Sequence, residues 1–153
     1  MTEEKERSAS SVVVACGSCG KRNRVPASRL ADTGRCGSCR AALPPRSEPI
    51  EVGAAELDEI VRDARVPVLV DFWAAWCAPC RMAAPEVAKT AREMAGRAIV
   101  LKVNTEEHPD AAARFGVQGI PNFVVLRSGL VLRQQAGVVP SAAMNAWLAA
   151  AAG

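Results

Sequence analysis

Residues 70–85 read VDFWAAWCAPCRMAAP, and this stretch decides the fold. It joins an apolar, β-branched run to a helical pattern over 80–95, which indicates a buried central strand followed by a helix. Cys77 and Cys80 form a C-x-x-C pair at the junction. Pro79 suits the first turn of a helix, because the amide hydrogen that proline lacks would have no partner there. The stretch therefore predicts a dithiol at the start of a helix.

Strand and helix patterns alternate around this stretch. Strands are expected over 50–52, 67–73, 98–104, 122–127 and 130–135, and helices over 54–64, 80–95, 109–115 and 141–151. Ser128 and Gly129 separate the last two strands, which indicates a hairpin with a tight turn. The order βαβαβαββα predicts an α/β domain with a mixed central sheet and helices on both faces.

The sequence divides into four parts. Residues 1–11 are polar and charged, and we expect a disordered tail. Residues 12–43 hold four cysteines and little apolar material, residues 44–49 read PPRSEP and predict a stiff linker, and residues 50–153 carry the α/β pattern. The linker predicts that the two ordered parts fold independently. No run approaches the ~18 apolar residues that span a membrane, and a signal-peptide pattern is absent, so we expect no membrane contact and a cytoplasmic location.

The cysteines of residues 12–43 have the spacing of a metal site. Cys16 and Cys19 form one CGSC tetrapeptide, Cys36 and Cys39 form another, and sixteen residues separate the two. Four thiolates with this spacing indicate a closed, tetrahedral site for one structural Zn²⁺ in a zinc ribbon. The segment also needs a metal, because about thirty residues with few large apolar groups cannot form a core of their own. An iron site of rubredoxin type and two working dithiols are the alternatives.

The third pair, Cys77 and Cys80, has positions suited to redox chemistry. Cys77 precedes the helix, where unpaired amides favour a thiolate, and Cys80 falls inside the first turn. We therefore expect Cys77 to be exposed and acidic and to attack, and Cys80 to be covered and to resolve the mixed disulfide. Lowering a thiol pKa from ~8.5 to ~7 raises the thiolate fraction roughly 16-fold but lowers nucleophilicity roughly 5-fold, so substrate positioning must contribute more.

The alternatives for this pair are a third metal knuckle and an inert pair in the core. A metal needs more ligands, and residues 50–153 offer only one histidine and no further cysteine. We therefore favour the redox interpretation.

The string WAAWCAPCR resembles the active-site motif of the thioredoxin family. The resemblance covers about residues 50–153 and extends through Asp71, Lys102-Val103-Asn104, Gly119-Ile120-Pro121, Gly129 and Gly137. With the four-cysteine segment ahead of it, the chain is similar to the zinc-ribbon-bearing thioredoxin 2 type of bacteria. The resemblance implies a thioredoxin fold and a protein-disulfide reductase that is itself reduced by an NADPH-dependent thioredoxin reductase. The family usually has CGPC, so Ala78 in place of glycine bears on the reduction potential.

The resemblance also implies roles for single residues. Asp71 is a lone carboxylate in an apolar strand, where burial raises its pKa, and it is implied to be an acid–base group beneath the dithiol. Lys102 is implied to lie near Asp71 and to influence its proton. The Ile120–Pro121 bond is implied to be cis, in a loop that faces the dithiol and pairs with the substrate backbone. The expected substrate-binding residues are Trp76, Ala78, Pro79, Ile120, Pro121 and Gly137.

Two other functions fit parts of the sequence. A zinc-dependent redox sensor or holdase would release its metal on oxidation. A nucleic-acid-associated module would use the basic excess of residues 1–50, which hold nine Lys or Arg against five Asp or Glu. No aromatic residues alternate with these charges, which argues against a nucleic-acid partner. We expect a monomer that acts on disulfide-containing proteins and binds no organic cofactor, with His108, the only histidine, in a solvated loop.

Overall fold

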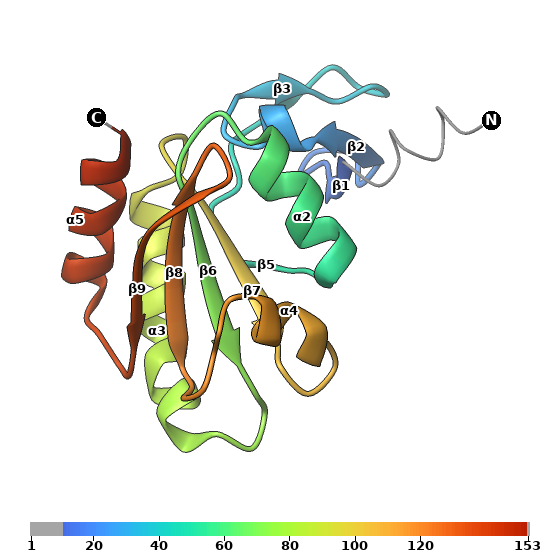
Figure 1. Ribbon diagram of the computed structural model, residues 1–153. Helices are drawn as coiled ribbons and strands as arrows, with labels where there is room; N and C mark the ends of the chain where they lie inside the picture. The colour runs from blue at the N-terminus through green and yellow to red at the C-terminus, as the bar shows by residue number, and fades with distance from the viewer. Residues whose placement is uncertain (1–10, 153) are drawn as a thin grey trace.

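The computed structural model describes residues 11–152 (Figure 1). Its N-terminal part consists of two short antiparallel hairpins joined through a 3-10 turn. The elements are β1 (Ser11–Ala15), β2 (Arg22–Pro26), the turn η1 (Ala27–Arg29), β3 (Gly34–Arg35) and β4 (Ala42–Leu43). Most of the tail expected over residues 1–11 lies outside the described residues, and that expectation stays a prediction.

The rest of the chain forms one mixed sheet with helices on both faces, as predicted. The strands are β5 (Ile50–Glu51), β6 (Val68–Trp73), β7 (Ile99–Asn104), β8 (Asn122–Arg127) and β9 (Leu130–Ala136), in the spatial order β5-β7-β6-β8-β9. The helices are α2 (Ala54–Asp63), α3 (Ala78–Glu93), α4 (Pro109–Arg114) and α5 (Ser141–Ala152). β6 runs parallel to β7 and antiparallel to β8, which makes the sheet mixed. None of the helices in the described range is long and apolar enough to cross a membrane.

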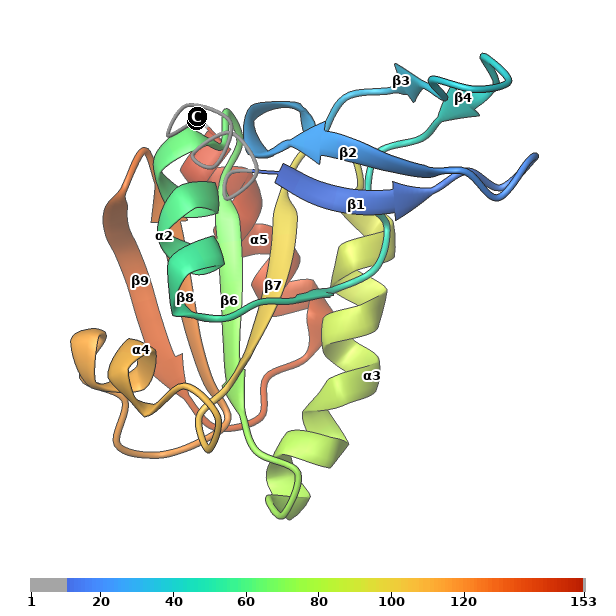
Figure 2. The same cartoon turned by 90° about the vertical axis from the view of Figure 1, so that its right-hand side faces the viewer.

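Alternation along the central strand β6 sorts its side chains into two cores. Val68, Val70 and Phe72 belong to the core under α2 and α4, whereas Leu69 belongs to the core under α3 and α5 (Figures 1 and 2). All four residues are at most 2% exposed. β6 is therefore buried on both faces, as its continuous apolar run predicts.

The cysteine pairs lie at opposite ends of the sheet. The two hairpins lie beside the end where β6 begins, and β6 runs away from them to its connection with α3 (Figure 2). Cys77 caps the N-terminus of α3 at that far end. The four cysteines of the hairpins are therefore remote from the Cys77–Cys80 pair.

The turn η1 packs the N-terminal part onto the core of the sheet. Ala27 and Leu30 are each 1% exposed and belong to the same apolar cluster as Leu57 and Ile60 of α2. The Arg46 N–H also donates to the Leu30 carbonyl oxygen at 3.2 Å. The two parts therefore share a core across the proline-rich linker, a contact that the linker's composition does not reveal. We expect this core to couple their folding, and the independence expected from the linker stays untested.

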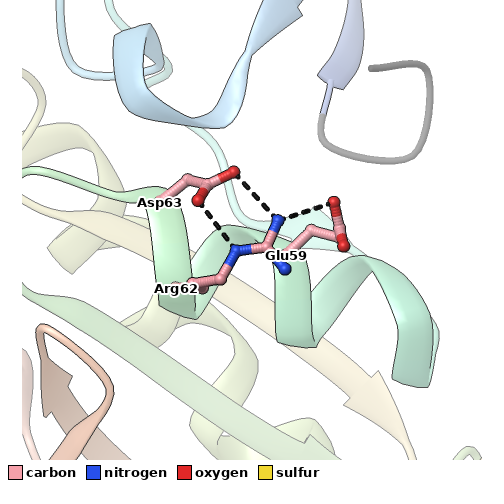
Figure 3. A network of polar contacts seen from close by, with 3 residues as sticks. All are labelled: Glu59, Arg62 and Asp63. Carbon is pink, nitrogen blue, oxygen red and sulfur yellow. Dashed lines mark hydrogen bonds and ion pairs between the residues drawn. The ribbon is translucent and has the colours of Figure 1, made fainter. Parts of the chain in front are cut away.

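The outward face of α2 carries a small ion-pair network (Figure 3). Arg62 contacts Glu59 and Asp63, each at 3.0 Å. The Arg62 side chain is 62% exposed, so solvent screens both pairs and they contribute little to stability. The buried face of α2, with Leu57 and Ile60, therefore holds the helix in place.

The free edge formed by β9 is apolar. Leu130, Val131 and Leu132 are 66%, 48% and 52% exposed, and β9 pairs only with β8 among the described strands. The pairing changes register between Val125 and Leu126, and such a bulge increases the local twist of the edge.

Replacing Leu30 with alanine tests the coupling through η1. Truncating a buried leucine costs about 2–5 kcal/mol. We expect Leu30→Ala to lower the free energy of unfolding by that amount in chemical denaturation followed by tryptophan fluorescence, because all three tryptophans lie after residue 50. The control is Arg29→Ala, whose side chain is 63% exposed. An unchanged tryptophan transition in Leu30→Ala would show that the hairpins are merely tethered to the sheet.

Candidate active site and metal centre

Cys77 and Cys80 meet where β6 passes into α3. Cys77 is the N-cap of α3 and forms a disulfide with Cys80, with their Cα atoms 5.2 Å apart. The Cys80 N–H donates to Cys77 Sγ at 3.2 Å. This amide and the positive end of a 16-residue helix both favour negative charge, so they stabilise a Cys77 thiolate once the disulfide is reduced.

Both cysteines are covered in the disulfide form. Cys77 is 3% exposed and Cys80 is 4% exposed. Trp73, Ala74 and Ile120 pack against the pair, and Cys77 Sγ lies 3.7 Å from the Ile120 carbonyl oxygen. The expectation of an exposed Cys77 is therefore wrong for this form. The loop before β8 covers the sulfur, and that loop is distant in sequence.

The Ile120–Pro121 loop faces the dithiol in the predicted conformation. The Ile120–Pro121 peptide bond is cis, and Pro121 is buried. The Gly137 N–H donates to the Pro121 carbonyl oxygen at 2.8 Å, and Gly137 has a φ of 96°, which suits glycine. The structure thus brings Ile120, Pro121 and Gly137 together beside the dithiol, although they come from two different connections.

The remaining expected substrate-binding residues lie on the exposed side of the pair. Ala78 and Pro79 are exposed in the first turn of α3. Trp76 is 66% exposed, and its Nε1–H donates to the Glu106 carboxylate at 3.0 Å, which holds the indole in one orientation. A large exposed aromatic side chain beside a redox-active pair is suited to contact with another protein.

Asp71 lies beneath this surface, within β6. It is 2% exposed and shares the sheet face of Leu69, which α3 covers. Its Oδ1 atom is buried and makes no hydrogen bond to any described residue. Burial raises the pKa of Asp71 to about 7, against an opposing attraction from Lys102 and with a smaller repulsion from Glu51. A carboxyl group with this pKa exchanges its proton at neutral pH.

Lys102 lies beside Asp71 in the sheet. The two residues are paired in the parallel register of β6 and β7. The Lys102 ammonium is placed over the Trp73 ring, with Nζ 4.6 Å from the ring centroid. Lys102 is thus close enough to lower the Asp71 pKa and is held chiefly by an aromatic ring.

The sequence analysis did not predict the positions of two residues near Asp71 and Lys102. Glu51 pairs with Lys102 across β5 and β7, and finding it requires knowing that β5 joins the sheet next to β7. His108 was expected in a solvated loop, but it is half-buried with its ring against Gly53 at the start of α2. A side chain at position 53 would collide with that ring, so the glycine allows the close approach. The local sequence carries no signal for either contact.

The four cysteines of the hairpins form a compact cluster. Their sulfur atoms all lie within 4.8 Å of one another, with Cys16–Cys39 at 3.7 Å and Cys19–Cys36 at 3.6 Å. Four sulfurs at ~2.3 Å from a tetrahedral Zn²⁺ would lie about 3.8 Å apart, so the cluster has the size of such a site. The four cysteines are therefore positioned to bind a metal ion.

Backbone amides favour the thiolate form of two of the four cysteines, Cys16 and Cys36. The Ser18 N–H donates to Cys16 Sγ at 3.3 Å, and the Ser38 N–H donates to Cys36 Sγ at 3.4 Å. Hydrogen bonds from the backbone of Cys39 and Ser38 lower the pKa of Cys36 to about 6. Asn23 links the two hairpins, because it accepts from the Gly37 N–H at 2.9 Å. Thiolates held in this way suit a metal that needs deprotonated sulfur.

A disulfide at a helix N-terminus, covered by a loop with a cis-proline, is an arrangement suited to disulfide exchange. The protein is therefore a dithiol–disulfide oxidoreductase. The family model described as "Thioredoxin" matches residues 48–150, and the model described as "Thioredoxin 2, N-terminal" matches residues 15–41. The chain belongs to the thioredoxin family. The thioredoxin fold and the thiol–disulfide oxidoreductase activity implied by the sequence resemblance are thereby confirmed.

Individual relatives agree with this assignment. The chain is 35% identical to "Thioredoxin C-3" of Corynebacterium nephridii, over 90% of this chain and 93% of the relative. It is 49% identical to "Thioredoxin 1" of Chlorobaculum tepidum, over 57% of this chain and 86% of the relative. Among solved structures, a mutant thioredoxin from Halobacterium salinarum NRC-1 matches with a TM-score of 0.65 and 30% identity, over 71% of this chain and 94% of that one.

Replacing Asp71 with asparagine tests the cost of burying this carboxylate. Because the pKa is raised from 3.8 to about 7 in the folded chain, the charged form opposes folding. The resulting loss in the free energy of unfolding is absent below about pH 4, grows as the pH rises towards 7 and is complete above it. We expect Asp71→Asn to raise the free energy of unfolding by up to about 4 kcal/mol at pH 8.5 and by little at pH 4, measured by denaturation.

The control for this measurement is Asp110→Asn, at an exposed position in α4. We expect it to show no comparable rise at pH 8.5. An Asp71→Asn effect of equal size at both pH values would instead indicate altered packing.

Proposed function

We propose that this thiol–disulfide oxidoreductase reduces disulfides in other proteins and is itself reduced by an NADPH-dependent thioredoxin reductase. The observation that carries the proposal is the Cys77–Cys80 disulfide at the N-terminus of α3, bordered by the exposed Trp76 and the Ile120–Pro121 loop. A disulfide so placed lies beside an exposed surface that a partner protein can contact. This arrangement serves a carrier that alternates between dithiol and disulfide.

In the first step of the proposed reaction, the Cys77 thiolate attacks one sulfur of the substrate disulfide. A bond forms between Cys77 Sγ and that sulfur, the substrate S–S bond breaks, and the other substrate sulfur leaves as a thiolate that takes a proton. The Cys80 N–H, which donates to Cys77 Sγ, stabilises the attacking thiolate.

In the second step, Cys80 resolves the mixed disulfide. Cys80 gives its proton to Asp71, its sulfur forms a bond to Cys77 Sγ, and the second substrate sulfur leaves as a thiolate and is protonated. Water reaches Cys80 poorly because that residue is 4% exposed. Asp71 lies on the face that α3 covers, and its pKa of about 7 suits a general base at neutral pH. Lys102 adjusts this proton transfer from the neighbouring strand.

We assign substrate binding to the surface around the pair. The Ile120–Pro121 loop offers backbone groups next to Cys77 Sγ, and Trp76 offers an apolar contact. The proposed set is Trp76, Ala78, Pro79, Ile120, Pro121 and Gly137. Since one chain carries the whole set, we propose that the protein acts as a monomer.

We propose that Cys16, Cys19, Cys36 and Cys39 hold one structural Zn²⁺. The four-sulfur cluster and the match to the N-terminal model of thioredoxin 2 support zinc. Four thiolates fill a tetrahedral shell, so the metal's contribution is to hold the two hairpins together and thereby to position η1. A thiolate-rich site persists best where thiols are kept reduced, which supports a cytoplasmic location.

The roles of the two cysteines are tested by trapping. With NADPH and thioredoxin reductase, we expect the wild-type chain to reduce many equivalents of a model disulfide protein. Cys80→Ser should accumulate a mixed disulfide through Cys77, visible by mass spectrometry, because the resolving thiol is gone. Cys77→Ser should trap nothing, because the helix N-terminus and the Cys80 N–H stabilise a thiolate at position 77 and not at position 80. Equal trapping by Cys77→Ser would reverse the assignment.

Metal analysis tests the proposed zinc site. We expect one Zn²⁺ per chain in freshly purified reduced protein, and none in Cys36→Ser. Chelation should lower the midpoint of the tryptophan-monitored unfolding transition, because η1 loses its support, while turnover at low temperature is retained since the dithiol lies at the other end of the sheet. A metal other than zinc would contradict the identity of the ion. Zinc loss that abolishes turnover of the folded chain would contradict the structural role and favour a redox sensor.

A further inference from the structure

Three charged residues lie side by side on three neighbouring strands. Glu51 of β5 is paired with Lys102 of β7, and Lys102 is paired with Asp71 of β6. Residues paired in a parallel sheet project from the same face, so Lys102 stands between two carboxylates. One of these, Asp71, is 2% exposed, whereas Glu51 lies at the exposed margin of the sheet.

Lys102 forms an ion pair with neither of these two carboxylates. Its Nζ lies over the Trp73 ring, and no ion pair within 4.0 Å joins Lys102 to a carboxylate of residues 11–152. An ammonium held by an aromatic ring between two acids divides its attraction between them. The attraction that Lys102 exerts on the Asp71 carboxylate therefore depends on the side chain at position 51.

The surroundings of Glu51 tie it to the same group. Partial burial raises the pKa of Glu51, against attraction from Lys102 and from the Trp73 indole, and Glu107 and His108 also face it. The buried Trp73 Nε1–H has no well-aligned acceptor among the described residues, so Glu51 lies close to a donor that is free to hold it. Glu51 thus lies near both Lys102 and Trp73, the ring that holds the Lys102 ammonium.

We propose that Glu51 is a positioning residue for the disulfide exchange, which shares the Lys102 ammonium with Asp71 and so determines how readily Asp71 takes the proton of Cys80. The inference rests on the proposed role of Asp71 as the base. The Glu51 charge repels the Asp71 charge directly and draws Lys102 towards the margin of the sheet. Both effects favour protonated Asp71, so removing the Glu51 charge should lower the pH at which Asp71 titrates.

The test is the titration of Asp71 itself, followed by NMR of its side-chain carbon in oxidised protein labelled at aspartate. Two charges two strand spacings apart, about 10 Å, interact enough to move a midpoint by about 0.3 to 1.2 pH units for effective dielectric constants of 80 to 20. We expect Glu51→Gln to move the Asp71 midpoint to lower pH by an amount in this range. Glu51→Asp should restore most of the wild-type midpoint.

The matched control is Glu48→Gln, which removes the same charge from an exposed position in the segment before β5. It should leave the midpoint unchanged. A second comparison uses Lys102→Met, in which the effect of Glu51→Gln should shrink because there is no ammonium left to share. An Asp71 midpoint that Glu51→Gln and Glu48→Gln move equally would overturn the inference.

A kinetic measurement separates this inference from the function on which it rests. The pH profile for resolving the mixed disulfide should shift in Glu51→Gln by the same amount as the NMR midpoint. If the midpoint shifts and the profile does not, Asp71 is not the base, and the positioning role of Glu51 in catalysis fails with it. If neither shifts while Asp71→Asn still slows resolution, the base is supported and the Glu51 inference alone is overturned.

Discussion

The rest of the site depends on burying one carboxylate in the central strand. β6 is covered on both faces by apolar side chains, and Asp71 is its only charged residue. The same desolvation that opposes folding brings the pKa of Asp71 to about 7, where it can accept a proton in neutral solution. The apolar cores around Val70 and Leu69 must therefore be stable enough to tolerate it. In the proposed mechanism, the stability lost by burying Asp71 provides the base that resolution requires.

The N-terminal hairpins act on this core mechanically. Their cysteines lie at the opposite end of the sheet from the dithiol, so a bound metal has no direct access to the exchanging sulfurs. What reaches the sheet is the packing of Ala27 and Leu30 against α2. Contacts run from the four-cysteine cluster through the hairpins and η1 to the core, which supports the proposed structural role of the metal.

Local sequence was sufficient wherever periodicity or spacing decided the outcome. The alternation of strands and helices, the helix start next to Cys77 and the clustering of the two N-terminal C-x-x-C pairs were all readable from short stretches. The cover over Cys77, the packing of Leu30 in the same core as α2 and the row from Glu51 to Asp71 were not. Each depends on which distant segments become neighbours in the sheet, and a pattern within one segment does not contain that information.

The apolar edge at β9 has a consequence for handling the protein. Leu130, Val131 and Leu132 stand on a strand whose outer backbone groups face solvent, the arrangement from which strand-to-strand aggregation begins. The bulge between Val125 and Leu126 twists the edge, and the charged Arg133 follows the apolar run with its guanidinium over the Trp147 ring, and both features oppose such pairing. A variant that straightened the bulge and neutralised Arg133 would be expected to precipitate from this edge while its dithiol remained intact.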